Sequence, residues 1–179
     1  MAKKILKANL SVSSIRNLQK ELNKYKESLT NKTAQFAKRL SEEGVNIAQI
    51  QIADFDAIFT GELIASIHSK FVDSAKHGAV FAVVADSSHA VFVEFGTLGS
   101  MGGKEEYPYP LPEGIQWNYG SGSHIIQNSK GEYGWFYKAD DGKVYWSSGM
   151  NSRPFMYSTA LQLRNKRLIE NIAREIFGK

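Results

Sequence analysis

The first fifty residues carry a helical pattern of apolar positions. Between 14 and 29 an apolar side chain recurs every three or four residues, and lysine and glutamate fill the gaps: Ile15, Leu18, Leu22, Tyr25 and Leu29. This spacing predicts one amphipathic helix, which Ser13 or Ser14 can cap. A second helix is predicted over 33–53, with Gly44 as its weak point, because glycine costs about 1 kcal/mol relative to alanine in a helix. The acidic stretch at 54–56 is expected to end it.

The period then changes from 3.6 to 2 residues. In GELIASIHSKFV (61–72) apolar and polar positions alternate, which is typical of a half-buried strand. The run AVFAVVAD (79–86) predicts a more buried strand, apolar on both faces, and a turn at His77 and Gly78 would join the two into an antiparallel hairpin.

The next segment, SSHAVFVEFGT (87–97), is ambiguous. Ser87 or Ser88 could cap a short helix that Gly96 closes. The alternation of apolar side chains fits a strand equally well, and propensity slightly favours the strand. In either case Glu94 stands inside an apolar run, so its carboxylate must reach solvent or meet a specific partner.

Residues 98–152 differ in composition, since they hold most of the glycines, three of the four prolines and all three tryptophans. KEEYPYPLPEG (104–114) predicts an extended loop, and the aromatic stretches on either side of Asp140, Asp141 and Gly142 predict a β-hairpin. We interpret 98–152 as an insertion within a single domain of 1–179. A hairpin of this size cannot bury its own rings, so four of them are predicted to contact a neighbouring subunit: Trp135, Tyr137, Tyr145 and Trp146. The alternative is that these rings cap the main sheet.

The last segment predicts one long helix. Pro154 is suited to its first turn, Ser152 is a possible cap and Gly178 marks the end. An apolar stripe runs through Leu161, Leu168, Ile172 and Ile176. The fold class expected from these elements is α+β: N-terminal helices, a small antiparallel sheet and a long C-terminal helix packed on the sheet.

Composition and charge restrict the function. Hydrophobic residues make up 42% of the chain, enough for a core, and the absence of cysteine excludes disulfides and thiol chemistry. No signal peptide and no apolar run of membrane-spanning length is evident. The net charge is segregated: +6 in 1–32, −6 in 33–152 and +4 in 153–179. This pattern fits a basic face for nucleic acid, subunits with complementary charges, or ordinary solvated helices.

Candidate chemistry is sparse. The histidines His68, His77, His89 and His124 lack metal-site spacing, and no nucleophile elbow or phosphate-binding glycine loop is present. We therefore expect no enzyme activity, no metal and no cofactor. Arg164, Lys166 and Arg167 cluster at 161–168 and could attract phosphates without reading sequence, so we predict that they face DNA.

Two short motifs carry a resemblance. FVEFGT (92–97), followed after an insertion by SRPFMYSTALQ (152–162) at the start of a terminal helix, resembles the neck or tail-completion proteins of long-tailed bacteriophages, also called head–tail joining proteins. In that family a "YVEFGT"-like element precedes an "ARPF"-like helix start. The structural motif that this resemblance marks comprises Glu94, Phe95, Gly96, Thr97, Arg153, Pro154 and Phe155. The resemblance also favours the helix over the strand for 88–95.

The resemblance implies a structural virion protein, assembled in the host bacterial cytoplasm, that forms a ring, commonly of six copies, at the head–tail interface. Its partners would be the capsid connector or adaptor, the tail tube or the tail terminator, and the DNA in the lumen would not be read in sequence. We expect no membrane to be involved. The alternatives are a tail terminator or other tail-end protein, and a nonspecific DNA-binding module.

The resemblance also suggests a partner for Glu94. Both Glu94 and Arg153 lie in apolar motifs beside a residue that restricts the backbone, Gly96 in one and Pro154 in the other. We expect a paired carboxylate and guanidinium across the sheet–helix junction.

Overall fold

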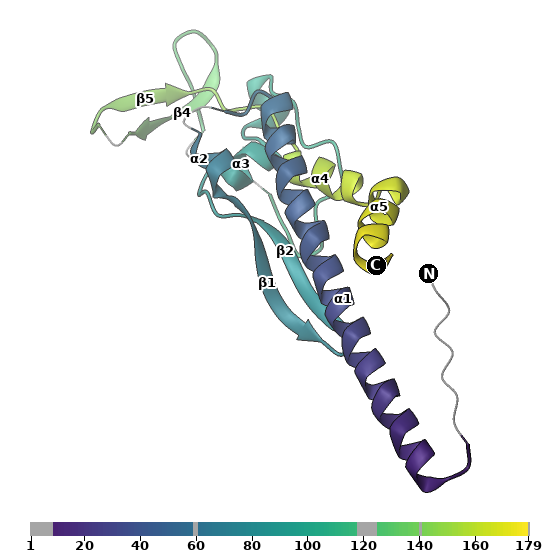
Figure 1. Cartoon of the computed structure of the whole chain (residues 1–179). Coiled ribbons are helices and arrows are strands. Elements are labelled where there is room, and N and C mark those ends of the chain that lie inside the picture. Colours follow the sequence, from purple (N-terminus) through teal and green to yellow (C-terminus); the bar gives the residue numbers. More distant parts are fainter. Residues whose placement is uncertain (1–8, 59–60, 118–124, 140, 179) are drawn as a thin grey trace. The chain divides into compact units, whose positions relative to one another are not determined.

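A computed structural model of the chain describes residues 9–58, 61–117, 125–139 and 141–178 (Figure 1). The fold is α+β, with a long N-terminal helix, two small antiparallel sheets and C-terminal helices that pack on the N-terminal helix. The chain forms two compact units. Unit 1 comprises 1–47, 67–84 and 160–179, and unit 2 comprises 48–66 and 85–159.

Helix α1 (Val12–Asp54) is one continuous helix, so the prediction of two N-terminal helices was wrong. The polar residues between the two predicted segments do not interrupt it, because none of them is proline or glycine. Its cap is Ser11, whose Oγ accepts a hydrogen bond from the Ser14 backbone N–H at 3.2 Å, instead of Ser13 or Ser14. The predicted end at Asp54 is confirmed.

In unit 1, strands β1 (Ile67–Ala75) and β2 (Gly78–Ala85) form the expected hairpin. Helix α2 (Glu62–Ser66), which belongs to unit 2, replaces the first half of the predicted strand 61–72, since a short alternating run also fits one helical turn. No residue of β2 is fully buried, which corrects the expectation of a strand buried on both faces. Gly44 permits close packing: a Cβ there would lie 2.6 Å from Val83 Cγ2 and 3.0 Å from Leu163 Cδ1.

The predicted C-terminal helix is two helices, α4 (Phe155–Leu163) and α5 (Lys166–Phe177). The helix is interrupted before Asn165, whose side chain caps α5 by accepting a hydrogen bond from the Arg167 N–H at 2.9 Å. Helix α5 packs on α1 and not on a sheet, as the Phe36 and Phe177 rings, 6.1 Å apart between centroids, demonstrate. The predicted stripe is buried most deeply at Ile172.

Unit 2 contains helix α3 (Ala90–Phe95), the 3₁₀ helix η1 (Gly99–Gly102) and a three-stranded sheet. Its strands are β3 (Ile126–Gln127), β4 (Tyr133–Lys138) and β5 (Val144–Ser147). Strands β4 and β5 form the predicted aromatic hairpin, with Phe136 opposite Trp146 and Tyr137 opposite Tyr145. The helical alternative for 88–95 is confirmed, and the strand that propensity favoured was wrong.

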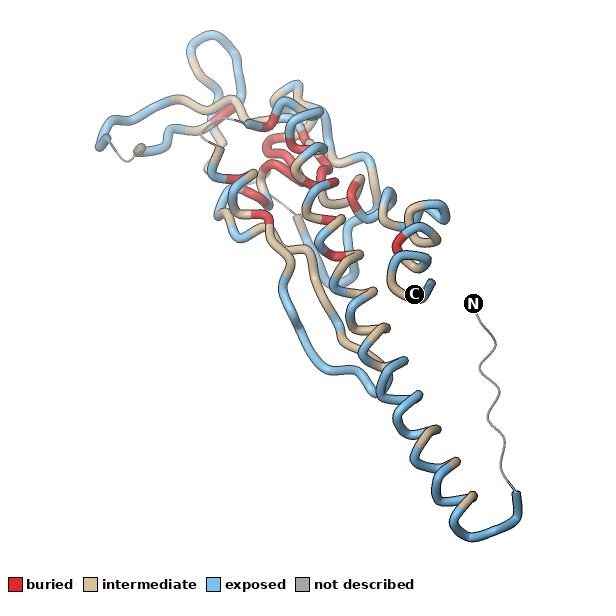
Figure 2. The backbone as a smooth tube through the Cα atoms, viewed as in Figure 1, coloured by how far each residue is buried: buried red, intermediate tan, exposed pale blue. Residues whose placement is uncertain are grey.

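Burial is uneven within the chain (Figure 2). The N-terminal half of α1 and most of β1 are exposed. Buried side chains gather in three segments of unit 2: 48–63, 90–98 and 152–159. Among these side chains, Ile52 and Phe155 are fully enclosed. The helices in the described part of the chain include none long and apolar enough to cross a membrane. The best-packed part of the molecule therefore contains both motifs that stood out in the sequence.

Candidate functional site: the joint between α3 and α4

The two motifs meet in unit 2 and form one structural element, which we call the α3–α4 joint (residues 92–98 and 150–157). Four hydrogen bonds that do not involve the Glu94 carboxylate connect its two sides. Thr97 N donates to the Met150 carbonyl at 2.9 Å, and Met150 N donates to Thr97 Oγ1 at 2.9 Å. Ser152 Oγ donates to the Glu94 carbonyl at 2.7 Å, and Arg153 N donates to the Val93 carbonyl at 2.8 Å. The Ser152 side chain therefore binds the main chain of α3, and the prediction that it caps the terminal helix was wrong.

Gly96 makes this close approach possible. It ends α3 with φ 72° and ψ 178°, a backbone conformation essentially restricted to glycine. A Cβ at this position would lie 2.6 Å from the Ser152 amide nitrogen. Both the conformation and the space therefore require glycine here.

Glu94 lies at the centre of the joint and is only 7% exposed. Its Oε2 accepts the Met156 N–H at 2.8 Å, and its Oε1 accepts the Tyr157 N–H at 3.1 Å. These are the second and third amides of α4, which a helical N-cap side chain normally satisfies. Pro154, the residue before the helix, has no side-chain acceptor, and Glu94 supplies one from about sixty residues away in the sequence.

The first turn of α4 is fully satisfied as a result. Phe155 N donates to the Arg153 carbonyl at 2.7 Å, and Ser158 N donates to the Pro154 carbonyl at 3.0 Å. Together with the two amides bound by Glu94, every backbone N–H of this turn has a partner. The helix dipole adds a favourable interaction with the negative charge.

Electrostatics at Glu94 are a balance between burial and hydrogen bonding. Burial raises the pKa of Glu94 above its usual 4.5, and the Met156 and Tyr157 amides and the Tyr107 side chain oppose that rise. Burial, together with the nearby Glu94 charge, raises the pKa of Tyr107 to about 12. Tyr107 therefore stays protonated near neutral pH, and its hydroxyl lowers the pKa of the Glu94 carboxyl.

The prediction of an ion pair between Glu94 and Arg153 was wrong. In the described residues no ion pair joins them, and both carboxylate oxygens bind backbone amides. Arg153 contributes its backbone N–H to the joint, while its side chain lines a cleft. The two motifs do meet as expected, but through the main chain of α4.

A shell of aromatic rings surrounds the joint, and sequence analysis did not anticipate it. The loop 104–117 covers α3: Tyr107 contacts Phe95 at 4.9 Å between ring centroids, and Trp117 contacts Phe95 at 5.4 Å. The Trp117 indole N–H also donates to the Gly96 carbonyl at 2.8 Å. Tyr109 stacks on Tyr157 of α4 at 3.8 Å. The tyrosines of YPYP were the available signal, because their spacing of two places both on one side of an extended chain.

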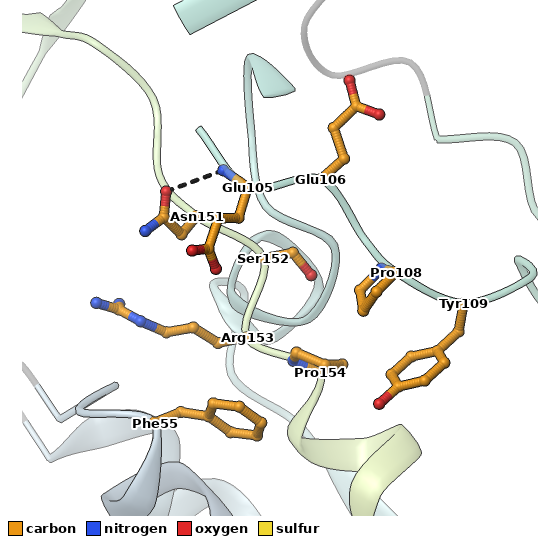
Figure 3. A pocket seen from close by; sticks show the side chains of 9 residues that line it. All are labelled: Phe55, Glu105, Glu106, Pro108, Tyr109, Asn151, Ser152, Arg153 and Pro154. Atoms are coloured by element: carbon orange, nitrogen blue, oxygen red, sulfur yellow. Dashed lines mark hydrogen bonds between the residues drawn. The ribbon is translucent and has the colours of Figure 1, made fainter. Parts of the chain in front are cut away.

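Beside the joint lies a cleft of about 570 Å³ (Figure 3). Apolar side chains of Phe55, Pro108 and Pro154 line it together with charged ones. The Arg153 side chain extends along it between Phe55 and Glu105, and the Glu105 backbone N–H donates to Asn151 Oδ1 at 3.1 Å. The lining carries mixed charge and no arrangement of a nucleophile with a base.

The other predicted contact residues lie outside the joint. In the β4–β5 hairpin, Tyr137 and Tyr145 are 46% and 42% exposed, whereas Trp135 and Trp146 are half-buried. Trp146 packs edge-on against Phe136 at 4.9 Å, within the arm itself. The three basic residues that were predicted to face DNA are all exposed: Arg164, Lys166 and Arg167. Which molecules these side chains contact stays a prediction.

A metal site requires several ligating side chains close together. Across the described ranges no group of three or more histidine, aspartate or glutamate side chains is placed to hold a metal ion. His68, His77 and His89 come from separate elements, and His124 lies outside the described residues.

Comparison with known proteins returned no match: no protein-family model, no curated protein and no solved structure resembles this chain closely enough to assign it.

Proposed function

We propose that this chain is a structural component of a tailed bacteriophage particle, a neck or tail-completion protein that forms a ring between the head and the tail. In this proposal it acts as a building block and not as an enzyme, and the DNA passes through the ring without sequence-specific contacts. Six copies, the capsid connector or adaptor and the end of the tail would be its neighbours.

The observation that carries the proposal is the α3–α4 joint. The resemblance rests on two motifs about sixty residues apart, and a genuine family motif pair should belong to one structural element. Glu94 and Gly96 of the first motif contact the second through Ser152 and the amides of α4. Chance similarity in two unrelated loops would not require this contact.

The distribution of apolar surface supports a role in assembly. Large apolar side chains are exposed on α1 and on the β1–β2 hairpin of unit 1, among them Leu22, Tyr25, Phe71 and Val72. Exposed apolar patches of this kind mark contacts with other proteins. A protein whose neighbours are further copies and other virion subunits would cover them on assembly.

The basic residues are suited to a nonspecific contact with DNA. Arg164 and Arg167 are exposed on either side of the Asn165 cap, and Lys166 has one exposed ion pair, to Glu170 at 3.8 Å. Exposed pairs contribute about 1 kcal/mol or less, so they leave Lys166 available to a phosphate.

The test is deletion of the gene from the phage or prophage that encodes it, followed by electron microscopy of the lysate. A head–tail joint protein predicts DNA-filled heads and finished tails that are separate, and restoration of whole particles by the wild-type gene supplied in trans. Normal particles from the deletion strain would overturn the proposal. Tails of irregular length would instead indicate the tail terminator, because the protein that ends the tube also determines where it stops.

A matched pair of complementing variants connects this test to the site. Glu94→Ala should fail to restore particles, because the cap of α4 is lost. Arg153→Ala keeps the backbone contacts and should restore them. The variant proteins should be quantified in the lysate, so that loss of folding is distinguished from loss of assembly.

A further inference from the structure

The N-terminal half of α1 carries an apolar stripe for which the described part of unit 1 provides no cover. Ile15, Leu22, Tyr25 and Leu29 are between 45% and 54% exposed, and only Leu18 is half-buried. Figure 2 shows this half of the helix as exposed along most of its length. In an amphipathic helix that finished its packing within its own chain, such a stripe would be buried.

The spacing of the stripe is that of a coiled coil. Its residues alternate strictly at three and four positions from 15 to 29, which is a heptad pattern with three a and two d positions. Positions a are Ile15, Leu22 and Leu29, and positions d are Leu18 and Tyr25. A stripe confined to a and d positions is the narrow seam of paired helices, not the broad face that a helix presents to a globular core.

The charges beside the seam favour the same segment of another copy as its partner, although Glu21 also pairs with Lys24 of its own helix at 3.9 Å. Glu21 occupies a g position and Lys26 the e position of the next heptad. In a parallel in-register pair each g side chain lies beside the following e side chain of the other helix, so Glu21 of each copy meets Lys26 of the other. Antiparallel pairing joins g to g and e to e, and it would lose both attractions.

We infer that residues 15–29 of α1 form a parallel, in-register two-stranded coiled coil with the same residues of a second copy. The seam ends at Lys32, a charged residue at the next d position. Two heptads are marginal for an isolated coiled coil, so we expect the folded remainders of the two copies to contribute further contacts in solution. Six copies in a ring would supply three such pairs.

The absence of cysteine from the chain permits a clean test on the full-length protein. In the parallel pair the a positions of the two copies face each other, so Leu22→Cys should form a disulfide with itself. Lys20, an exposed f position, faces away from the seam. At the interaxial distance of about 8–10 Å the f positions lie beyond the Cα separation of about 4.4–6.8 Å that a disulfide needs. Lys20→Cys is therefore the matched control.

Under mild oxidation, Leu22→Cys should cross-link at least ~10-fold faster than Lys20→Cys, because paired thiols experience an effective concentration in the millimolar range. Circular dichroism verifies that both variants keep their helix. Equal rates for the two variants would overturn the inference. Mixing Leu22→Cys with Tyr25→Cys tests the orientation: a parallel pair gives mainly the two homodimers, and a predominant mixed dimer would overturn the parallel arrangement.

Charge exchange tests the choice of partner. Glu21→Lys and Lys26→Glu each place like charges across the pair, so each alone should slow cross-linking of Leu22→Cys. Mixing the two variants restores opposite charges and should favour the mixed dimer. A purely statistical mixture would overturn the assigned register. These experiments use purified protein and do not depend on the neck assignment, which the deletion experiment tests separately.

Discussion

The α3–α4 joint and the N-terminal half of α1 contain similar residue types but differ in which of them are buried. Both contain apolar side chains interspersed with charged ones. In the joint, Glu94 is buried and both its oxygens are bound by amides of α4. On α1, Leu22 and Tyr25 remain exposed beside ordinary surface charges.

The difference shows which contacts the chain completes by itself. A buried charge is tolerated only where its hydrogen bonds are complete, so the joint must form within one folded chain. An exposed apolar seam costs little in a single copy and becomes useful when a second copy covers it. We therefore expect the joint to contribute to the stability of a single folded chain, and the seam to contribute to association between copies.

The largest effect is expected from removing the acid. Glu94→Ala leaves two amides of α4 without their acceptor and should lower the free energy of unfolding by about 3–4 kcal/mol, since hydrogen bonds to charged groups contribute about 1.5–3 kcal/mol each and relief of burial returns part of the loss. Urea denaturation followed by tryptophan fluorescence measures it.

The control for this prediction is Arg153→Ala, which should cost less than about 1 kcal/mol, because its side chain lines the cleft without an ion pair in the described residues. An equal loss for both variants, with strong coupling in the double variant, would restore the ion pair that the structure replaces.

The partner of Glu94 was predicted wrongly from the sequence for a physical reason. Sequence patterns report side chains, and the partner of Glu94 is a set of backbone amides that exists only because a helix begins at Phe155. The apolar neighbours of Glu94 indicated only that its carboxylate must reach solvent or meet a specific partner, and the meeting of the two motifs was expected from the resemblance. An acid beside a helix whose preceding residue is proline, and therefore lacks a capping oxygen, is the signal that identifies the partner.

The fold was predictable where local signals are strong. The β4–β5 hairpin followed from aromatic strands around a turn, and the end of α1 from its acidic residues. The break at Asn165 was missed because Asn inside a periodic apolar pattern weakens a helix only slightly, and its capping bond to Arg167 decides the outcome. Helix α2 was missed because four or five residues cannot distinguish a period of 2 from one of 3.6.

The next largest effect concerns the close approach of the two sides. Gly96→Ala should lower the free energy of unfolding by about 2–3 kcal/mol. Residues other than glycine rarely adopt its backbone conformation, and a Cβ would lie 2.6 Å from Ser152 N. Gly103→Ala is the control, since Gly103 also has a positive φ, +68°, but nothing lies within 4 Å of its Cβ position. It should cost about 1 kcal/mol from conformation alone. Similar losses in the two variants would mean that steric fit at the joint contributes nothing.

A smaller effect is expected at the hydroxyl that supports Glu94. Tyr107→Phe removes the hydroxyl that favours the ionised carboxylate and should lower the free energy of unfolding by about 1 kcal/mol near neutral pH. Tyr109→Phe is the control, because its ring stacks on Tyr157 and its hydroxyl has no partner in the described residues. If Tyr109→Phe is as costly, the aromatic shell contributes only through packing.

The pH dependence of the same group has a definite sign. Burial raises the pKa of Glu94, so between the unfolded pKa of about 4.5 and the higher folded pKa the native state binds more protons than the unfolded state. The free energy of unfolding contributed by Glu94 therefore falls as pH rises through this window. Glu94→Gln should lack this slope, and Tyr107→Phe, which loses an interaction that lowers the pKa, should extend it to higher pH. If the unfolding free energy of the wild type, plotted against pH, runs parallel to that of Glu94→Gln, the raised pKa of Glu94 is contradicted.

The smallest effect on stability is expected where the apolar surface is exposed. Leu22→Ala should change the free energy of unfolding at low protein concentration by less than about 0.5 kcal/mol, since Leu22 is 48% exposed and alanine favours the helix. Sedimentation at increasing concentration should nevertheless reveal weaker self-association, because the a position of the seam is lost. Val91→Ala is a useful control, as Val91 is exposed on α3 and outside the seam. A Leu22 variant that destabilises the dilute monomer as strongly as Tyr107→Phe would mean that α1 completes its packing within one chain, and the contrast between the two regions would then disappear.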